Sequence, residues 1–190
     1  MARRTAGRML AAAVAVTLIA TLTLAGSAQA RTVQQINAGA DAALARFQQQ
    51  VSGSTALLAR ARGVLVFSEV IKAGAGIGGE YGEGVLRVGG RSVAYYSFAS
   101  ASVGLQFGLQ KKDIIILFLA EEALRQFQAK GPNEGWQVGV DGSIVLVDVG
   151  ANASIDSSKV NQPIVAFVVG QKGLMFNLTL EGSKITKLNK

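Results

Sequence analysis

The chain has 190 residues, 19 of them lysine or arginine against 12 aspartate or glutamate, and it contains no cysteine and no histidine. These absences exclude disulfide bonds, thiol nucleophiles and imidazole bases within the chain, and with them Ser-His-Asp and Cys-His catalysis. The surplus of positive charge favours anionic partners.

The first thirty residues have the features of a secretory leader. A basic start, an apolar run and a small-residue site follow one another, at Arg3, Arg4 and Arg8, at Met9 to Leu24, and at Ala28-Gln29-Ala30. We predict that residues 1–30 form a signal peptide and that the mature chain starts at Arg31, in the periplasm or outside the cell. An uncleaved membrane anchor is the alternative. Without the three leader arginines the mature chain keeps 16 basic and 12 acidic residues, a net charge of +4.

Three segments of residues 31–190 show the apolar spacing of helices. They lie at about 32–50, 55–62 and 120–130. In the first segment apolar residues recur every three or four positions from Ile36 to Phe47, and Thr32 or Asn37 can cap its start.

The rest of the mature chain has the composition and two-residue alternation of β-strands. Strands are expected at GVLVFSEV, VLRV, RSVAYYSF, DIIILFL, WQVGV, SIVLVDV, PIVAFVVG and GLMFNLTLEG. Gly89-Gly90 is predicted to form a hairpin turn, and the Lys111-Lys112 pair a second turn. Ten glycines between Gly74 and Gly108 permit sharp bending of a sheet. We therefore predict one α+β domain, with N-terminal helices on a strongly curved, glycine-rich antiparallel sheet that is barrel-like or sandwich-like.

The segment KAGAGIGGEYGEG contains a G-x-G-x-x-G pattern at Gly74, Gly76 and Gly79. In a dinucleotide site these glycines precede a helix whose N-terminus faces the phosphates. The residues after Gly79 alternate like a strand, and two glutamates there would repel a phosphate. We therefore interpret these glycines as part of the curved sheet and expect no nucleotide site.

Several blocks in the same order resemble the SYLF domain. The blocks are ARGVLVFSEVIKAGAGIGGEYGEGVL, GGRSVAYYSFASASVGLQFGLQKKDIIILFL, EEALRQF and KGLMFNLTLEGS, and they extend from about Thr55 to Ser183. This lipid-binding family includes exported bacterial proteins and, in eukaryotes, proteins of actin patches and membrane traffic that also carry SH3 or FYVE modules. The resemblance implies binding of phosphoinositides or other anionic phospholipids, without catalysis and without a cofactor or metal.

Three basic residues near the first strand are the candidate lipid-binding residues. Arg60 and Arg62 end the second predicted helix, and Lys72 lies at the far end of the strand that follows. Guanidinium and ammonium groups suit phosphate oxygens. Apolar residues of the same helices, Phe47, Leu57 or Leu58, are expected at the acyl boundary of the membrane.

Other chemistries are weaker alternatives. Glu80 and Glu83 could be compared with a glycosidase pair, although alternation would place them on opposite faces. The loop with Asp148, Asn152 and Asp156 lacks the ligand order of a calcium loop. Scattered basic residues and few adjacent aromatics argue against nucleic-acid binding. Two functions stay open: peripheral association with an anionic phospholipid membrane, or a non-catalytic structural or protein-interaction role with a protein partner.

Overall fold

A computed structural model of the chain describes residues 30–132, 134–148, 161–169 and 180–190. The chain divides into two compact units, Met1–Arg31 and Thr32–Lys190, and every helix and strand described below belongs to the second. The predicted signal peptide and most of the expected strand GLMFNLTLEG lie outside the described residues. Among the helices that are described, none combines the length and the apolar character that crossing a membrane requires.

Two helices begin the domain. Helix α2, Val33–Gln50, is the amphipathic helix that the apolar spacing predicts, and Thr32 caps it. The Thr32 hydroxyl accepts a bond from the Gln35 backbone, and the Gln35 side chain accepts one from Thr32, which satisfies two otherwise free N–H groups. Helix α3, Ser54–Arg60, follows after a glycine with left-handed backbone, Gly53.

A long antiparallel hairpin forms the centre of the domain. Strand β1, Gly63–Val88, pairs with β2, Arg91–Phe118, along almost its whole length. The predicted turn at Gly89 and Gly90 is confirmed, with φ angles of 57° and 78° that favour glycine. The predicted turn at Lys111-Lys112 is wrong, because both lysines lie within β2, opposite Ile71 and Val70.

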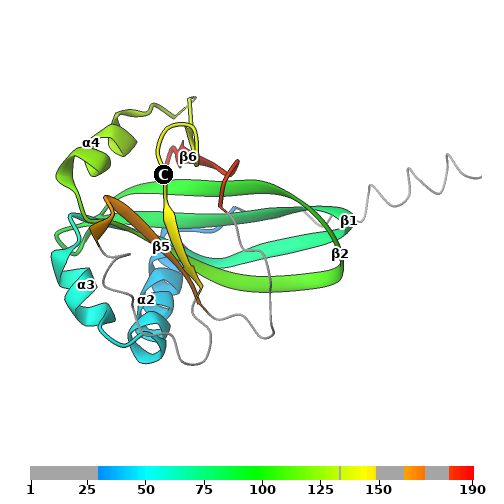
Figure 1. Cartoon of the computed structure of the whole chain (residues 1–190), viewed down its shortest axis with the longest axis horizontal. Helices are drawn as coiled ribbons and strands as arrows, with labels where there is room; N and C mark the ends of the chain where they lie inside the picture. Colours follow the sequence, from blue (N-terminus) through cyan, green and yellow to red (C-terminus); the bar gives the residue numbers. More distant parts are fainter. Residues whose placement is uncertain (1–29, 133, 149–160, 170–179) are drawn as a thin grey trace, which may run out of the picture. The chain divides into compact units, whose positions relative to one another are not determined.

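The hairpin is folded on itself near its middle (Figure 1). Between Gly74 and Gly76, one residue of β1 faces three residues of β2, so β2 takes the longer path around the bend. Beyond the bend the two halves of β1 come close: a methyl group on Gly82 would lie 2.8 Å from the Val70 side chain. We call this bend the corner of the hairpin. The backbone from Gly74 to Gly79 is part of β1, so no helix follows the G-x-G-x-x-G pattern.

Four short strands complete a six-stranded sheet in the described residues. They are β3 (Trp136–Gln137), β4 (Val145–Asp148), β5 (Ile164–Val169) and β6 (Lys184–Leu188). Strand β6 pairs with the first half of β2 and β5 with its second half. The α+β class is confirmed, but the sheet is mixed rather than wholly antiparallel, since β4 and β5 run parallel. The sequence did not lead us to expect β6.

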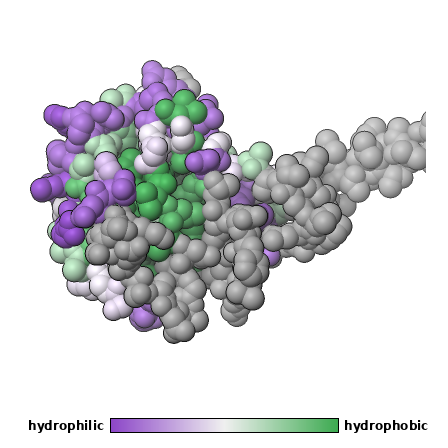
Figure 2. Space-filling view, viewed as in Figure 1, coloured by the Kyte–Doolittle hydropathy of each residue, from purple (hydrophilic) through white to green (hydrophobic). Residues whose placement is uncertain are grey.

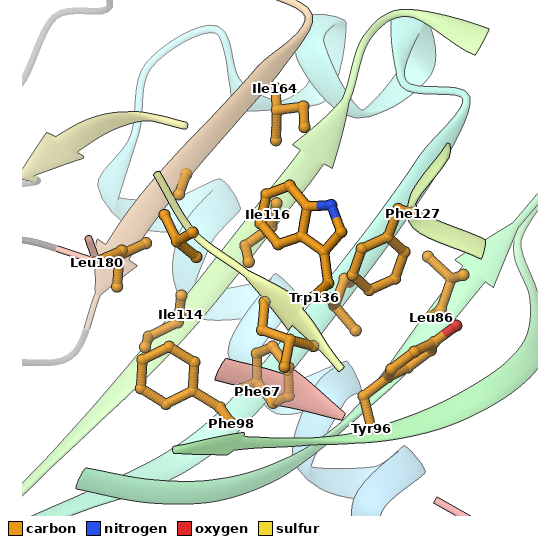
Figure 3. Close-up of a cluster of buried hydrophobic side chains, with 14 of the residues drawn as sticks. Phe67, Leu86, Tyr96, Phe98, Ile114, Ile116, Phe127, Trp136, Ile164 and Leu180 are labelled. Carbon is orange, nitrogen blue, oxygen red and sulfur yellow. The ribbon is translucent and has the colours of Figure 1, made fainter. Parts of the chain in front are cut away.

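Alternate residues of the strands point into two different cores. On one face, residues such as Leu65, Ile114 and Ile116 pack against helix α4, Glu121–Ala129, and against Trp136. Figure 3 shows Phe127 of α4 beside Trp136 in this core, and their ring centroids are 5.7 Å apart. On the opposite face, α2 and α3 cover Val66, Ile115 and their neighbours. We call these the α4 face and the α2 face of the sheet.

Candidate functional site

Two of the predicted lipid-binding residues, Arg60 and Arg62, lie at the junction of α3 and β1. Arg60 is the last residue of the helix, and the Arg62 backbone N–H donates to the carbonyl of Phe118, which fixes this end of the strand pair. Both residues are exposed. No ion pair joins either guanidinium to an acid of the described residues, so both are free to meet an external anion.

The third predicted residue, Lys72, lies elsewhere. It is ten positions after Arg62 along β1, a distance of roughly 30 Å for extended chain. Its side chain is about three-quarters buried, and its ammonium lies 3.5 Å from Glu80 Oε1. The structure therefore does not bring Lys72 together with the arginines, and its positive charge already has a partner.

Lys72 belongs instead to a buried group at the corner, with Glu80 and Lys112. The Lys112 ammonium lies 2.7 Å from Glu80 Oε2, and the side chains of Lys112 and Glu80 are 4% and 8% exposed. We call these three residues the corner cluster. Lys72 and Lys112 come from the paired strands on one side of the bend, whereas Glu80 comes from the other side. The cluster therefore ties the two halves of the folded hairpin together on the α4 face.

Glu83, the other carboxylate of the segment KAGAGIGGEYGEG, has a different environment. It lies 2.8 Å from the Lys190 ammonium, and the Tyr81 hydroxyl donates to it at 3.4 Å. Partial burial raises the pKa of the Tyr81 hydroxyl, and the negative charge of Glu83 raises it further. Glu80 and Glu83 are thus each neutralised by different lysines, an arrangement typical of structural carboxylates.

A third ion pair anchors α2 to the sheet. Arg46 of α2 donates to Asp113 Oδ2 at 2.8 Å, and Asp113 Oδ1 accepts the Glu69 backbone N–H at 2.9 Å. Glu69 lies in a bulge of β1 and has a φ of 55°, a conformation that is uncommon for residues other than glycine. The Asp113 carboxylate therefore accepts the Glu69 backbone N–H, which has no partner in the strand pairing at this bulge.

Among the described residues, several exposed basic side chains have no acidic ion-pair partner. They are Arg60, Arg62, Arg91, Lys184 and Lys187. In contrast, Asp41, Glu69, Glu80, Glu83, Asp113, Glu122 and Asp141 all have ion-pair partners. In the view of Figure 2 hydrophilic residues gather over α3 and α4, while hydrophobic residues lie centrally over β4 and β5.

The apolar residues that we expected at the acyl boundary lie in the core. Phe47 and Leu57 are buried, and Leu58 is partly buried against the same cluster. The ring of Phe47 packs on Phe167 of β5, with centroids 4.8 Å apart. These side chains therefore hold α2 and α3 on the sheet and are not available to a membrane in this conformation.

No metal site stands out in the described residues: they contain no group of three or more aspartates and glutamates placed to hold an ion. The loop from Asp148 to Asp156, which we compared with a calcium loop, lies almost entirely outside them.

A comparison with known families matches the C-terminal part of the chain. Residues 99–190 match the family described as Ysc84: Las17-binding protein actin regulator, whose domain is the SYLF domain. The resemblance to the SYLF-domain family is confirmed over these residues. The block KAGAGIGGEYGEG and the rest of β1 precede the matched residues. No curated protein matches the chain.

Proposed function

We propose that this protein is exported and associates peripherally with anionic phospholipids at a membrane surface. The observation that carries this proposal is the set of exposed basic residues without acidic partners, foremost Arg60 and Arg62. Phosphatidylglycerol, cardiolipin and phosphoinositides all present phosphate oxygens that guanidinium groups bind well. The match to the SYLF-domain family supports the same class of ligand.

Burial of the apolar residues of α2 and α3 determines how the domain would bind a membrane. Because Phe47 and Leu57 belong to the core, the folded domain has no exposed apolar face on α2 or α3 to insert. At these two helices the attraction must then come mainly from charge, at about 1 kcal/mol for each basic residue near the surface. Such attraction weakens as salt screens it, since the Debye length falls to about 8 Å at physiological ionic strength.

A protein-interaction role is the second candidate. The family description names binding to Las17 and regulation of actin for members of the family. A structural or adaptor domain could share this fold and its basic surface without binding lipid. The two candidates differ in one property, because only the first predicts affinity for protein-free vesicles.

Co-sedimentation with vesicles distinguishes these candidates. Protein beginning at Arg31, which retains every described element, is mixed with vesicles of phosphatidylcholine alone or with added phosphatidylglycerol or cardiolipin. We expect more protein in the pellet with the anionic vesicles at low salt, and a marked loss at about 0.5 M salt. Equal pelleting with neutral and anionic vesicles would remove the electrostatic part of the proposal, and pelleting with neither would favour the protein-interaction role.

A further inference from the structure

The corner cluster holds more positive than negative charge inside the domain. Two ammonium groups share one carboxylate, because Lys72 approaches Glu80 Oε1 and Lys112 approaches Glu80 Oε2. The cluster as a whole therefore carries one uncompensated positive charge. Burying such a charge in a protein is costly unless a counter-charge accompanies it.

Neighbouring acids do not supply that counter-charge in the described residues. Asp113 follows Lys112 directly, but it points to the α2 face, where Arg46 binds it. Glu69 pairs with the exposed Lys111. Glu83 lies 2.8 Å from Lys190. Each of these carboxylates thus already has its own cation.

The arrangement of the two lysines suits an anion. Lys112 lies opposite Val70 across the strand pair, and Lys72 is two residues further along β1, so both extend from one face of adjacent strands. Lys112 is almost wholly buried, whereas the Lys72 side chain is 25% exposed, which gives the cluster a side open to solvent. An anion entering there would meet one ammonium at the surface and a second behind it.

We propose that Lys72 and Lys112 form a binding site for a phosphate group, with Glu80 as the internal counter-ion that holds the empty site together. The phosphate could be carried by a small soluble anion or by a phospholipid headgroup. The headgroup case rests on the membrane association proposed above, and the soluble case does not. In both cases the bound phosphate completes the charge balance of the cluster and stabilises the folded hairpin.

Thermal unfolding with soluble anions tests the site directly. Inorganic phosphate and glycerol phosphate are added to protein beginning at Arg31, against chloride at equal ionic strength. A ligand that binds only the folded state must stabilise it, and near ten times the dissociation constant we expect a rise in melting temperature of about 3 °C. Phosphate also stabilises proteins in general by exclusion from their surface, so the comparison between variants is decisive.

Three variants separate the site from that general effect. Lys72→Met and Lys112→Met each remove one ammonium, and Lys111→Met is the matched control, since it removes the same charge at the next residue, on an exposed side chain. We expect Lys72→Met to lose at least half of the phosphate-dependent rise and Lys111→Met to keep it. If Lys112→Met fails to fold, Lys72→Met, which changes a partly exposed side chain, still tests the site. Glu80→Gln, where it folds, should bind phosphate more tightly because no carboxylate then competes.

Vesicle binding by the same variants identifies the source of the phosphate. Loss of both the soluble-anion shift and phosphatidylglycerol binding in Lys72→Met would assign a headgroup site. Loss of the soluble-anion shift alone would assign a site for a free phosphate and leave the membrane proposal untouched. Loss of vesicle binding alone, with no soluble-anion shift in the parent, would assign a headgroup held only at a membrane. If Lys72→Met and Lys112→Met match Lys111→Met in both measurements, the phosphate site is overturned.

Discussion

At the scale of single residues, Tyr96 shows how the core acts on a titratable group. Its side chain packs between the strands and α4, with its ring centroid 4.9 Å from that of Phe127. Burial raises the pKa of the Tyr96 hydroxyl above its ordinary value, because the phenolate would lose its hydration. In the unfolded chain the same hydroxyl ionises near about pH 10.

The sign of the resulting pH dependence is fixed by this difference. Between the unfolded and folded pKa values the folded state holds a proton that the unfolded state has released, so stability falls as pH rises above about 10. We expect the melting temperature of Tyr96→Phe to fall less than that of the parent between about pH 9 and pH 11. Identical pH profiles for the two proteins would show that Tyr96 ionises as easily in the fold as in water.

The individual site residues were only partly predictable. The arginines at the end of the second helix are exposed cations as expected, because chain position and composition already separate a helix end from a core. The partnership of Lys72 with Glu80 and Lys112 depends on the corner, which brings residues 72 and 80 together across a bend of the same strand. Lys112 was misjudged as a turn residue because two adjacent lysines are rare inside a buried strand.

At the scale of secondary-structure elements, glycines make the folded hairpin possible. A methyl group on Gly84 would lie 2.5 Å from the Phe67 ring and would also meet the Val66 carbonyl oxygen. A methyl group on Gly79 would find only the Ser100 carbonyl oxygen, at 3.6 Å, which is an ordinary contact. The backbone at Gly84 thus leaves no room for a methyl group, whereas the backbone at Gly79, in the same strand, does.

Alanine substitution measures that difference. We expect Gly84→Ala to lose about 1–3 kcal/mol of the free energy of unfolding, as overpacked cores usually do. Gly79→Ala should change it by no more than about 0.5 kcal/mol. Urea unfolding followed by circular dichroism gives both values. A Gly84→Ala protein as stable as Gly79→Ala would contradict the close approach of the two halves of β1.

The glycine pattern in β1 leads to a second prediction for this element. Because the strand continues through Gly74 to Gly79, no helix N-terminus is present there to bind a pyrophosphate. Added NAD or ATP, with phosphate as the reference anion, should leave the melting temperature at the phosphate value. A further rise of several degrees with NAD would indicate a nucleotide site.

Elements with a strong periodic signal were predicted well, and the pairings between distant segments were not. Helix α2 follows from its apolar spacing and its Thr32 cap, and α4 follows from Leu124 and Phe127. Strand β6, KITKL, carries two lysines and only two large apolar residues, so its sequence resembles a polar tail. It is a strand because β2 presents an open edge to it from Tyr95 to Ala99. The parallel pairing of β4 with β5 likewise leaves no local trace in the sequence.

At the scale of the whole domain, the distribution of charge supports the membrane proposal. Most acidic side chains of the described residues form ion pairs with basic side chains, whereas several exposed basic residues have no ion-pair partner there. The ion pairs therefore stabilise contacts within the domain, while the unpaired arginines and lysines give its surface a positive field. That field, rather than the net charge alone, is what an anionic membrane would meet.

The most direct test of membrane association compares two charge-matched double variants. Arg60→Glu with Arg62→Glu reverses the unpaired arginines at the junction of α3 and β1, and Arg125→Glu with Lys130→Glu makes the same change in net charge around α4. The first pair should weaken binding to phosphatidylglycerol vesicles by about 2 kcal/mol or more, roughly thirtyfold, with an unchanged circular dichroism spectrum. The α4 variant should bind much more like the parent in the same co-sedimentation assay. If the folded Arg60→Glu/Arg62→Glu protein binds as the parent does, the two arginines do not form the membrane contact, and the proposed membrane surface at the junction of α3 and β1 is wrong.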